Sequence, residues 1–282
     1  MLSIGDLVLD ITIVPERRLR PDDDTPAAIS IGGGGQSANF GAWTAWLGED
    51  ACLVTRVGDD DAGRRAVAEL EAMGVRVHAV TAAEPTGAVA VLVGPDGERT
   101  MATQRGASLG LRAEDLRPEW FEGAGLVHIP AYSLFHEPLS GAAASAVAHA
   151  RRQGALLAVD LSSVAGLLEY GPSRMVGELG RMRPDLLFGT AAEAETLGGI
   201  DTLARICVIK LGAAGCQIGS RRITAPTVDV VDPTGAGDAF AAGFCASFLH
   251  GASPVAAAEA AVQVAADAVS RRGARPAATR RP

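Results

Sequence analysis

The sequence has 282 residues, of which 48% are hydrophobic, and this is enough for one large α/β core. Its net charge of −8 at pH 7 argues against a nucleic-acid-binding protein, whose binding surface would be basic. The four cysteines form no CxxC pair and the five histidines form no HxxxH motif, so the sequence predicts neither a disulfide framework nor a zinc site.

The amino-terminal residues 2–9 are predicted to form the first strand of a buried sheet. Asp6 and Asp10 interrupt this apolar stretch and no basic segment precedes it, which argues against a signal peptide. Asp10 would lie at the carboxyl end of the strand, where open α/β sheets place ligand groups. The prolines and the acidic triplet within residues 11–31 disfavour a helix, whereas 11–14 and 28–31 fit a short strand pair.

Four glycines at 32–35 lead into a predicted helix that ends at Gly48. Phe40, Trp43 and Leu47 share one face of this helix. The glycine turn fits either a close approach of the backbone to a ligand or a flexible hinge.

Residues 52–80 alternate strand, helix and strand, which predicts a parallel sheet with helices on both faces. Residues 86–105 instead favour a β-hairpin that turns at 94–97. Together with the 11–31 strands it would form a small sheet outside the main fold. Arg99 and Arg105 fit either contacts to an anionic or hydroxyl-rich substrate or solvated positions on the hairpin.

Polar residues follow several of the later predicted strands. Tyr132 follows strand 126–129 and would either stack on a sugar ring or pack under a loop. Asp160 ends strand 155–159, where it would orient a phosphate or cap the next turn. Lys210, the only lysine, lies in strand 207–211 without a Walker glycine loop, which excludes a P-loop NTPase.

Residues 228–249 carry the clearest functional pattern. A predicted strand at 228–231 and a predicted helix at 239–249 flank the turn formed by Gly235, Ala236, Gly237 and Asp238. Two glycines before a helix let successive backbone N–H groups point at one anion. Asp238 at the mouth of this pocket would cap the helix, accept a proton from a substrate hydroxyl, or do both. The uncharged run 239–258 is broken by glycine and proline, so it does not indicate a membrane span.

The string DPTGAGDAF at 232–240 resembles the carboxy-terminal signature of the ribokinase-like, or PfkB, carbohydrate kinases. Gly34 and Gly35, followed four residues later by Asn39, resemble the amino-terminal signature of the same family. The resemblance implies one domain, residues 1–282, with a three-layer α/β sandwich around a mostly parallel sheet. It also implies a small β-sheet lid whose strands lie within 11–31 and 86–105.

The resemblance implies an ATP-dependent enzyme that moves the γ-phosphate of MgATP to a hydroxyl of a sugar or sugar derivative. Asp238 would be the catalytic base, and the amides of Gly235, Ala236 and Gly237 would bind the transferred phosphate. The sugar would be bound by Asp10, Gly34, Gly35 and Asn39, with Arg105 and Tyr132 as further candidates.

The same resemblance implies where ATP and its cations bind. Glu193 matches a residue that arranges Mg²⁺-bound water, but Thr190 stands where the family has an asparagine and offers fewer hydrogen-bond donors. Lys210 replaces a usual threonine in the nucleotide loop that contains Gly212 and Gly215, with Gly237 nearby. Asp232 and Thr234 would help to hold a monovalent cation such as K⁺. The basic residues after 270, including Arg275, are expected to form a solvated tail. The expected partners are the sugar, ATP and a second copy bound through the lid, in the cytoplasm, with no nucleic acid or membrane.

Three other functions are open on the sequence. A nucleoside kinase would need an aromatic stacking surface on its lid, and residues 11–31 and 86–105 contain no Phe, Tyr or Trp, which favours a sugar. A non-catalytic sugar sensor would explain the departures at Thr190 and Lys210, but not the intact Asp238. An NAD-dependent enzyme is disfavoured because Phe240 stands where the dinucleotide motif needs a small residue.

Overall fold

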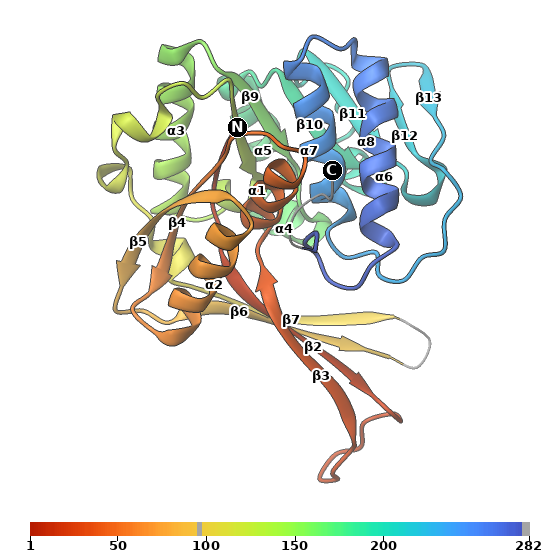
Figure 1. The fold of residues 1–282 in the computed structure, drawn as a ribbon. Coiled ribbons are helices and arrows are strands. Elements are labelled where there is room, and N and C mark those ends of the chain that lie inside the picture. Colours follow the sequence, from red (N-terminus) through yellow and green to blue (C-terminus); the bar gives the residue numbers. More distant parts are fainter. Residues whose placement is uncertain (95–97, 278–282) are drawn as a thin grey trace.

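The computed structural model describes residues 1–94 and 98–277. Its centre is a nine-stranded sheet in the order β13-β12-β11-β10-β9-β8-β1-β4-β5 (Figure 1). Neighbouring strands from β5 to β11 pair in parallel, and β12 and β13 add an antiparallel edge. The strands are β1 (Leu2–Ile4), β4 (Ala51–Gly58), β5 (Val75–Ala82), β8 (Leu126–Pro130), β9 (Leu156–Asp160), β10 (Leu186–Thr190), β11 (Ile206–Lys210), β12 (Cys216–Ile218) and β13 (Arg221–Ile223).

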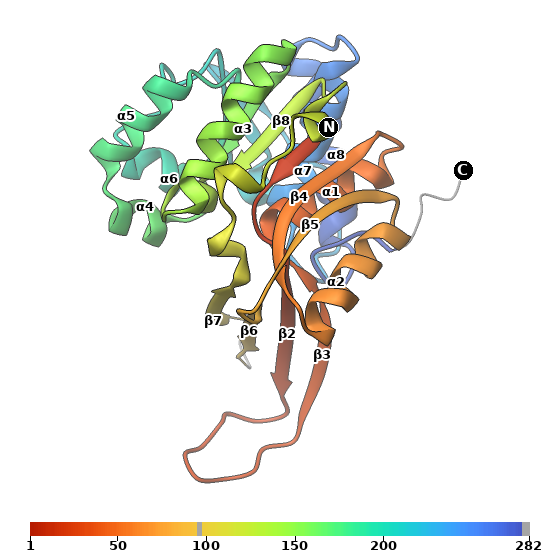
Figure 2. The ribbon, with the colours of Figure 1, turned by 90° about the vertical axis from the view of Figure 1, so that its left-hand side faces the viewer.

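Helices cover both faces of this sheet (Figure 2). One face carries α1 (Gln36–Trp46), α2 (Asp61–Ala72), α7 (Ala236–Leu249) and α8 (Pro254–Val269). The other carries α3 (Leu139–Gln153), α4 (Val164–Tyr170), α5 (Pro172–Met182) and α6 (Ala191–Thr196). The three-layer architecture predicted from the sequence is therefore confirmed. Across the residues that the structure describes, no helix has the length and apolarity needed to cross a membrane.

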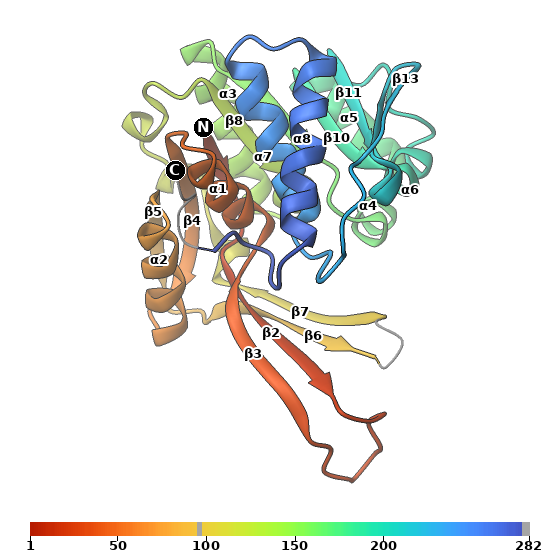
Figure 3. The ribbon, with the colours of Figure 1, turned by 45° about the vertical axis from the view of Figure 1, so that its right-hand side comes forward.

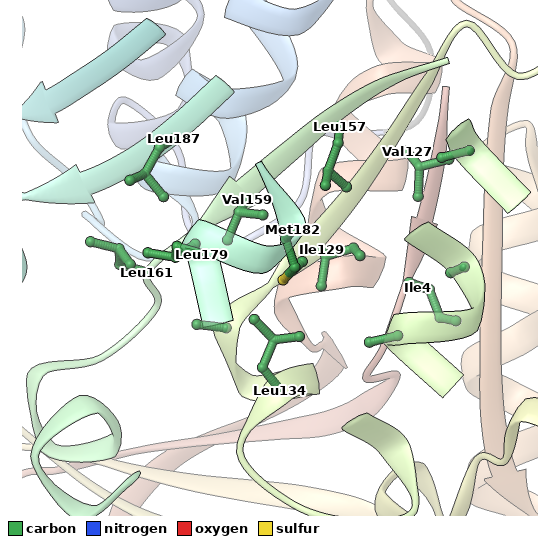
Figure 4. Close-up of a cluster of buried hydrophobic side chains, with 14 of the residues drawn as sticks. Ile4, Val127, Ile129, Leu134, Leu157, Val159, Leu161, Leu179, Met182 and Leu187 are labelled. Atoms are coloured by element: carbon green, nitrogen blue, oxygen red, sulfur yellow. The ribbon is translucent and has the colours of Figure 1, made fainter. Parts of the chain in front are cut away.

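Alternation along the central strands builds the two halves of the core. Val127, Ile129, Leu157 and Val159 point toward α3 and α5 (Figure 4). Their neighbours in the same strands point the other way, toward α1, α7 and α8. Because successive side chains of a strand face opposite sides, a strand covered by helices on both faces is apolar throughout.

A separate four-stranded sheet, the lid, projects from one end of the body (Figure 1). Its order is β3-β2-β6-β7. The pairs Ile11 with Ile31 and Val14 with Ala28 confirm the predicted strand pair within 11–31. The predicted turn at 94–97 lies mostly outside the described residues. The lid strands are β2 (Val8–Pro15), β3 (Ala27–Gly34), β6 (Thr86–Val93) and β7 (Arg99–Gly106).

The predicted single strand at 2–9 is wrong. Strand β1 ends at Ile4, and the chain turns at Gly5, whose φ is +152°, before it enters the lid as β2. Asp10 therefore lies on the lid rather than at the edge of the main sheet. Asp6 is the acid that directly follows β1. The apolar residues on both sides of the break conceal it in the sequence.

The predicted strand at 228–231 is also wrong, because no strand is assigned there. The backbone of Val231 instead donates to the carbonyl of Val269, at the end of α8. Val230 and Val231 are exposed, and without a neighbouring strand their apolar alternation does not produce sheet pairing.

Candidate active site

The candidate site lies where the parallel strands of the main sheet end. Asp160 ends β9, Thr190 ends β10 and Lys210 ends β11, and the sheet register places Thr190 beside Lys210. Ligand groups gather at this edge because the carboxyl ends of parallel strands share it.

The glycine turn at the start of α7 has the geometry that binds an anion. Gly235 adopts a left-handed φ of +75°, and a Cβ there would lie 2.2 Å from the carbonyl oxygen of Ala274. The first-turn N–H groups of a helix have no acceptor within the helix and carry its positive dipole. The amide of Ala236 also makes a long 3.4 Å hydrogen bond to Pro233. Ala236 and Gly237 line an open cleft, so packing does not fill the turn.

Asp238 lies in the first turn of the same helix and meets a residue from the other signature. The side-chain amide of Asn39 donates to Asp238 Oδ2 at 2.9 Å. Burial raises the pKa of Asp238 to about 8, and the hydrogen bond from Asn39 opposes part of this rise. An acid with a pKa near neutrality is well suited to exchange a proton with a hydroxyl group.

Lys210 places a positive charge beside the turn. Its ammonium group pairs with Asp160 at 2.6 Å, and a Cβ on Gly237 would lie 3.3 Å from Lys210 Nζ. Burial alone would lower the pKa of Lys210, but the carboxylate of Asp160 and the charges of Glu193 and Asp238 together outweigh it, so the pKa is raised. The ammonium group therefore stays charged at the point where an anion would bind.

A cleft of about 520 Å³ leads away from the turn, and most of its lining is apolar. Lys210 and Gly237 lie beside the turn, which suits phosphates, and the many apolar side chains of the lining suit a planar base. The lining includes Lys210, Gly212, Gly215, Ala236, Gly237, Val228, Val230, Val262 and Val269. The structure thus brings together the nucleotide residues predicted around Lys210.

Thr190 and Glu193 form a reciprocal cap at the start of α6. The backbone of Thr190 donates to Glu193 Oε2 at 2.7 Å, and the backbone of Glu193 donates to the Thr190 hydroxyl at 3.3 Å. Glu193 is buried and its charge acts on Lys210, so it lies close to the cleft. The roles of Thr190 toward the nucleotide and of Glu193 toward Mg²⁺ stay predictions.

Asp10 approaches the site from the lid. A Cβ at Gly34 would lie 2.1 Å from Asp10 Oδ1, so the glycine allows the carboxyl group to pack on the backbone of the turn. Burial raises the pKa of Asp10 to about 6, and the charge of Arg275 opposes this rise. Gly35 ends the same turn as the N-cap of α1, and its carbonyl accepts from the backbone of Asn39, one helical turn later, at 2.8 Å.

Asp6, Arg105 and Tyr132 form one cluster beside the lid. Asp6 accepts from the backbone of Ser37 at 3.2 Å and from Arg105 at 2.9 Å. The guanidinium carbon of Arg105 lies 3.6 Å from the centre of the Tyr132 ring, a cation–π contact. Arg105 is therefore not a solvated hairpin charge, and Asp6, which the sequence did not single out, holds it.

Two arginines were not expected in these places. Arg275, predicted to lie in a solvated tail, is buried and contacts Asn39, Gly34 and Glu69. Arg99 of the lid contacts Asp232 and Thr234. No residue pattern near either arginine in the sequence predicts these contacts, because the partners of both lie more than 100 residues away.

Comparison with known proteins agrees with this geometry. The family model described as pfkB family carbohydrate kinase matches residues 1–280. The chain belongs to the pfkB family. An ATP-dependent ribose-1-phosphate kinase of Halopiger xanaduensis is 32% identical over 295 aligned residues, which cover 99% of this chain and 95% of that protein.

Solved structures share the fold of this kinase. The adenosine kinase of Sinorhizobium meliloti superposes with a TM-score of 0.86 at 24% identity, covering 98% of this chain and 95% of that chain. An Escherichia coli protein assigned as a ribokinase II, solved with ATP and Mg²⁺, gives 0.83 at 24% identity, covering 97% and 93%. The family membership makes this chain a carbohydrate kinase, which phosphorylates a sugar or sugar derivative with ATP.

Proposed function

We propose that this kinase binds a sugar between Asp10 and Asn39 and transfers the γ-phosphate of MgATP to one of its hydroxyl groups, with Asp238 as the general base. The observation that carries the proposal is the 2.9 Å hydrogen bond from Asn39 to Asp238. This bond supports the proposal because it joins Asp238, in the glycine turn at 235–238 (the phosphate turn), to Asn39, which follows the glycine turn at 32–35 (the sugar loop).

The proton moves from the sugar to Asp238. A hydroxyl group that lies against the ionised carboxylate donates its proton as the oxygen attacks the γ-phosphorus, and the bond to the β-phosphate oxygen breaks. The raised pKa of Asp238, about 8, makes its carboxylate a stronger base than an ordinary aspartate. The hydrogen bond from Asn39 keeps the carboxylate aimed at the site.

The phosphate turn stabilises the charge that develops during transfer. Phosphoryl transfer depends mostly on positioning and electrostatics, and amides at a helix N-terminus supply both without rearranging. The amides of Gly235, Ala236 and Gly237 and the ammonium group of Lys210 are the groups available here. Bound Mg²⁺ would neutralise charge on the phosphates of ATP. It needs only one or two carboxylates besides the phosphates, and Glu193 fits that role through a water molecule.

The sugar side favours a hydroxyl-rich substrate. Asp10 offers carboxylate oxygens, and Asn39 and the backbone of Gly34 and Gly35 offer an amide and main-chain groups. Arg105 and Tyr132 are further candidates for contact. The lid strands lack aromatic residues, which supports a sugar rather than the base of a nucleoside.

We further infer that two copies of the kinase associate through their lids. Directly paired residues point to the same face of a sheet, and the face opposite Asp10 carries Ile11, Ile13, Ile29 and Ile31. Ile29 is 62% exposed and Ile31 is 48% exposed. An apolar face of this kind fits a second copy of the same sheet. The buried free thiols support a reducing, cytoplasmic location.

The direct test is coupled release of ADP over a panel of free sugars, sugar 1-phosphates, sugar acids and nucleosides. Turnover with one of the three sugar classes is expected. A preference for nucleosides would contradict the proposal that the side of the site next to the lid binds a sugar rather than a nucleoside base. Sugar binding without turnover on any compound would support a sensor instead of an enzyme.

A further inference from the structure

We propose that Arg275 is a positioning residue of the active site, which fixes the Asn39 amide against Asp238 and holds the sugar loop at Gly34. The proposal builds on the proposed roles of Asn39 and Asp238. Arg275 lies in the segment after α8, which turns back past α1 (Figure 3).

Arg275 is only 7% exposed, and its guanidinium group donates to three different partners. Nε donates to Asn39 Oδ1 at 3.1 Å, and Nη2 donates to the carbonyl of Gly34 at 2.8 Å. Nη1 donates to Glu69 Oε1 of α2 at 3.2 Å. A rigid planar fork with five N–H groups can serve three acceptors at once, which an ammonium group on a flexible chain does less well.

These contacts determine which way the Asn39 amide points. Its oxygen accepts from Arg275, so its NH₂ group is directed at Asp238 Oδ2. If the amide flipped, its NH₂ group would face the guanidinium donors and its oxygen would face the carboxylate. Arg275 therefore selects the one orientation in which Asn39 supports the base.

Residues 273 and 274 of the same segment also contact both signature regions of the sequence. The backbone of Gly273 donates to Asp232 Oδ2 at 3.0 Å, and the indole of Trp43 donates to the carbonyl of Ala274 at 3.0 Å. Ala274 also packs against Gly235 of the phosphate turn. The segment thus connects the phosphate turn with α1, and Arg275 ends that connection at the sugar loop.

The positive charge of Arg275 also acts on Asp10. Arg275 lowers the pKa of Asp10, whereas burial and the charges of Asp6 and Asp232 raise it. Glu69 compensates part of the Arg275 charge. Removal of the guanidinium group is therefore expected to raise the pKa of Asp10 further.

The test compares Arg275→Met, Arg275→Lys and the control Arg272→Ala, which removes an exposed arginine of the same segment. With the best sugar of the panel, we expect Arg275→Met to raise the sugar KM about tenfold and to lower kcat about fivefold, while the KM for ATP stays unchanged. Together these changes lower kcat/KM about fiftyfold, or by about 2.3 kcal/mol, which is the size expected when two hydrogen bonds of about 1 kcal/mol each are lost. Arg275→Lys keeps the positive charge but not the planar guanidinium group. Its sugar KM should therefore rise, whereas the acidic side of the pH profile of kcat/KM for the sugar should stay at the wild-type pH.

In Arg275→Met the acid limb of kcat/KM for the sugar is expected to move to higher pH. A lower melting temperature with both KM values and the limb unchanged would assign Arg275 a structural role and overturn the proposal. Should Arg275→Met not fold, the Lys variant decides: a wild-type sugar KM contradicts the proposal. Lack of turnover by the wild-type kinase on the whole panel would instead refute the proposed function.

A second inference comes from the lid. Arg99 donates to Asp232 Oδ1 at 2.6 Å and also to the hydroxyl of Thr234, directly before the phosphate turn. From these contacts we infer that the guanidinium group of Arg99 supplies the positive charge that a monovalent cation was expected to supply there, so that the kinase works without K⁺.

The oxygen atoms expected around a cation are already engaged. Asp232 Oδ1 also accepts from the backbone of Thr234 at 2.8 Å, and Oδ2 accepts from Gly273. Both carboxylate oxygens of Asp232 therefore already accept hydrogen bonds from Arg99, Thr234 and Gly273. A K⁺ ion would have to displace the guanidinium group, so this donor set does not fit the ion while Arg99 is in place.

Initial rates in KCl, NaCl and tetramethylammonium chloride at one ionic strength test this inference. The wild-type kinase is expected to vary less than twofold, whereas Arg99→Met should lose activity and regain at least part of it in KCl. Arg17→Met, an exposed lid arginine, is the control. Activation of the wild type by K⁺ of fivefold or more would overturn the inference, and so would an Arg99→Met variant with wild-type rates in all three salts.

Discussion

Asn39 and Asp238 are 199 residues apart in the sequence, and their side chains share a 2.9 Å hydrogen bond. The bond joins the helix after the sugar loop to the helix after the phosphate turn. Because α1 and α7 both pack on the same face of the sheet, the fold sets this distance. The two signatures therefore act as one site.

Asp238→Asn removes the base and keeps the shape of the side chain. We expect kcat to fall by about 10²- to 10⁴-fold, the usual contribution of a general base, with the KM for ATP nearly unchanged. Steady-state kinetics with saturating sugar checks this. Asp229→Asn, an exposed acid before the turn, is the control and should keep full activity. Near-normal turnover of Asp238→Asn would refute its role as the base.

The pH dependence of kcat/KM reports the ionisation of the free enzyme. Asp238 must be ionised to accept a proton, so kcat/KM should rise with pH up to about 8, with Asp10 contributing a step near 6. Asn39→Ala removes a hydrogen bond that lowers the pKa of Asp238, so its limb should move to higher pH. Profiles from pH 5 to 9.5 measure both. A wild-type limb centred near 4 contradicts this assignment.

Asp238 is also expected to cost stability at high pH. Its pKa is raised in the folded state, so its favourable contribution to the free energy of unfolding is fully present below about pH 4. This contribution is lost as the pH rises through about 8. Asp238→Asn should therefore melt above the wild type at pH 8 and near it at pH 4. Thermal unfolding shifts by about 2–4 °C per kcal/mol in a protein of this size. An equal shift at both pH values would contradict the raised pKa.

The sequence predicts the fold well where one rule decides a segment. The apolar strands and the helices with clear ends could be recognised from local residues alone, without knowledge of their neighbours. The lid strand pair within 11–31 could likewise be predicted, from its prolines and from the alternation of apolar and polar residues. The break at Gly5 and the unpaired segment at 228–231 depended on neighbours that the sequence does not reveal. In both places apolar residues flank the point where sheet pairing changes or is missing.

The same reasoning explains what was found and missed in the site. Glycine turns and the acid beside them are local patterns, so Gly235, Asn39 and Asp238 could be identified. Arg275 and Asp6 acquire their roles from partners on other elements. An arginine in a short polar segment is most often solvated, and only the buried acceptors around Arg275 change that expectation.

Lys210 and Asp160 should behave as a coupled pair. Lys210→Met removes the charge at the phosphate turn and leaves Asp160 buried without its partner, which is expected to destabilise the fold by about 3–5 kcal/mol and to reduce kcat by about 10²-fold. The double variant with Asp160→Asn should regain most of the stability but not the activity. Chemical denaturation and ADP release measure the two effects. Recovery of both in the double variant would show that Lys210 has no role toward the phosphates.

The apolar lid face predicts the oligomeric state. We expect a dimer at micromolar concentration, and Ile29→Asp together with Ile31→Asp should give monomers, because four charges would then face each other in the contact. Met101→Asp is the matched control, since the sheet register places the exposed Met101 on the opposite face of the lid, with Asp10 and Arg99. Sedimentation velocity distinguishes these states. A wild-type monomer, or a double variant that remains dimeric, would exclude this face as the contact.

If the dimer also steadies the lid over the sugar, the monomeric variant should show a higher sugar KM with an unchanged KM for ATP, since the nucleotide cleft is lined by β11, α7 and α8 and by loops outside the lid.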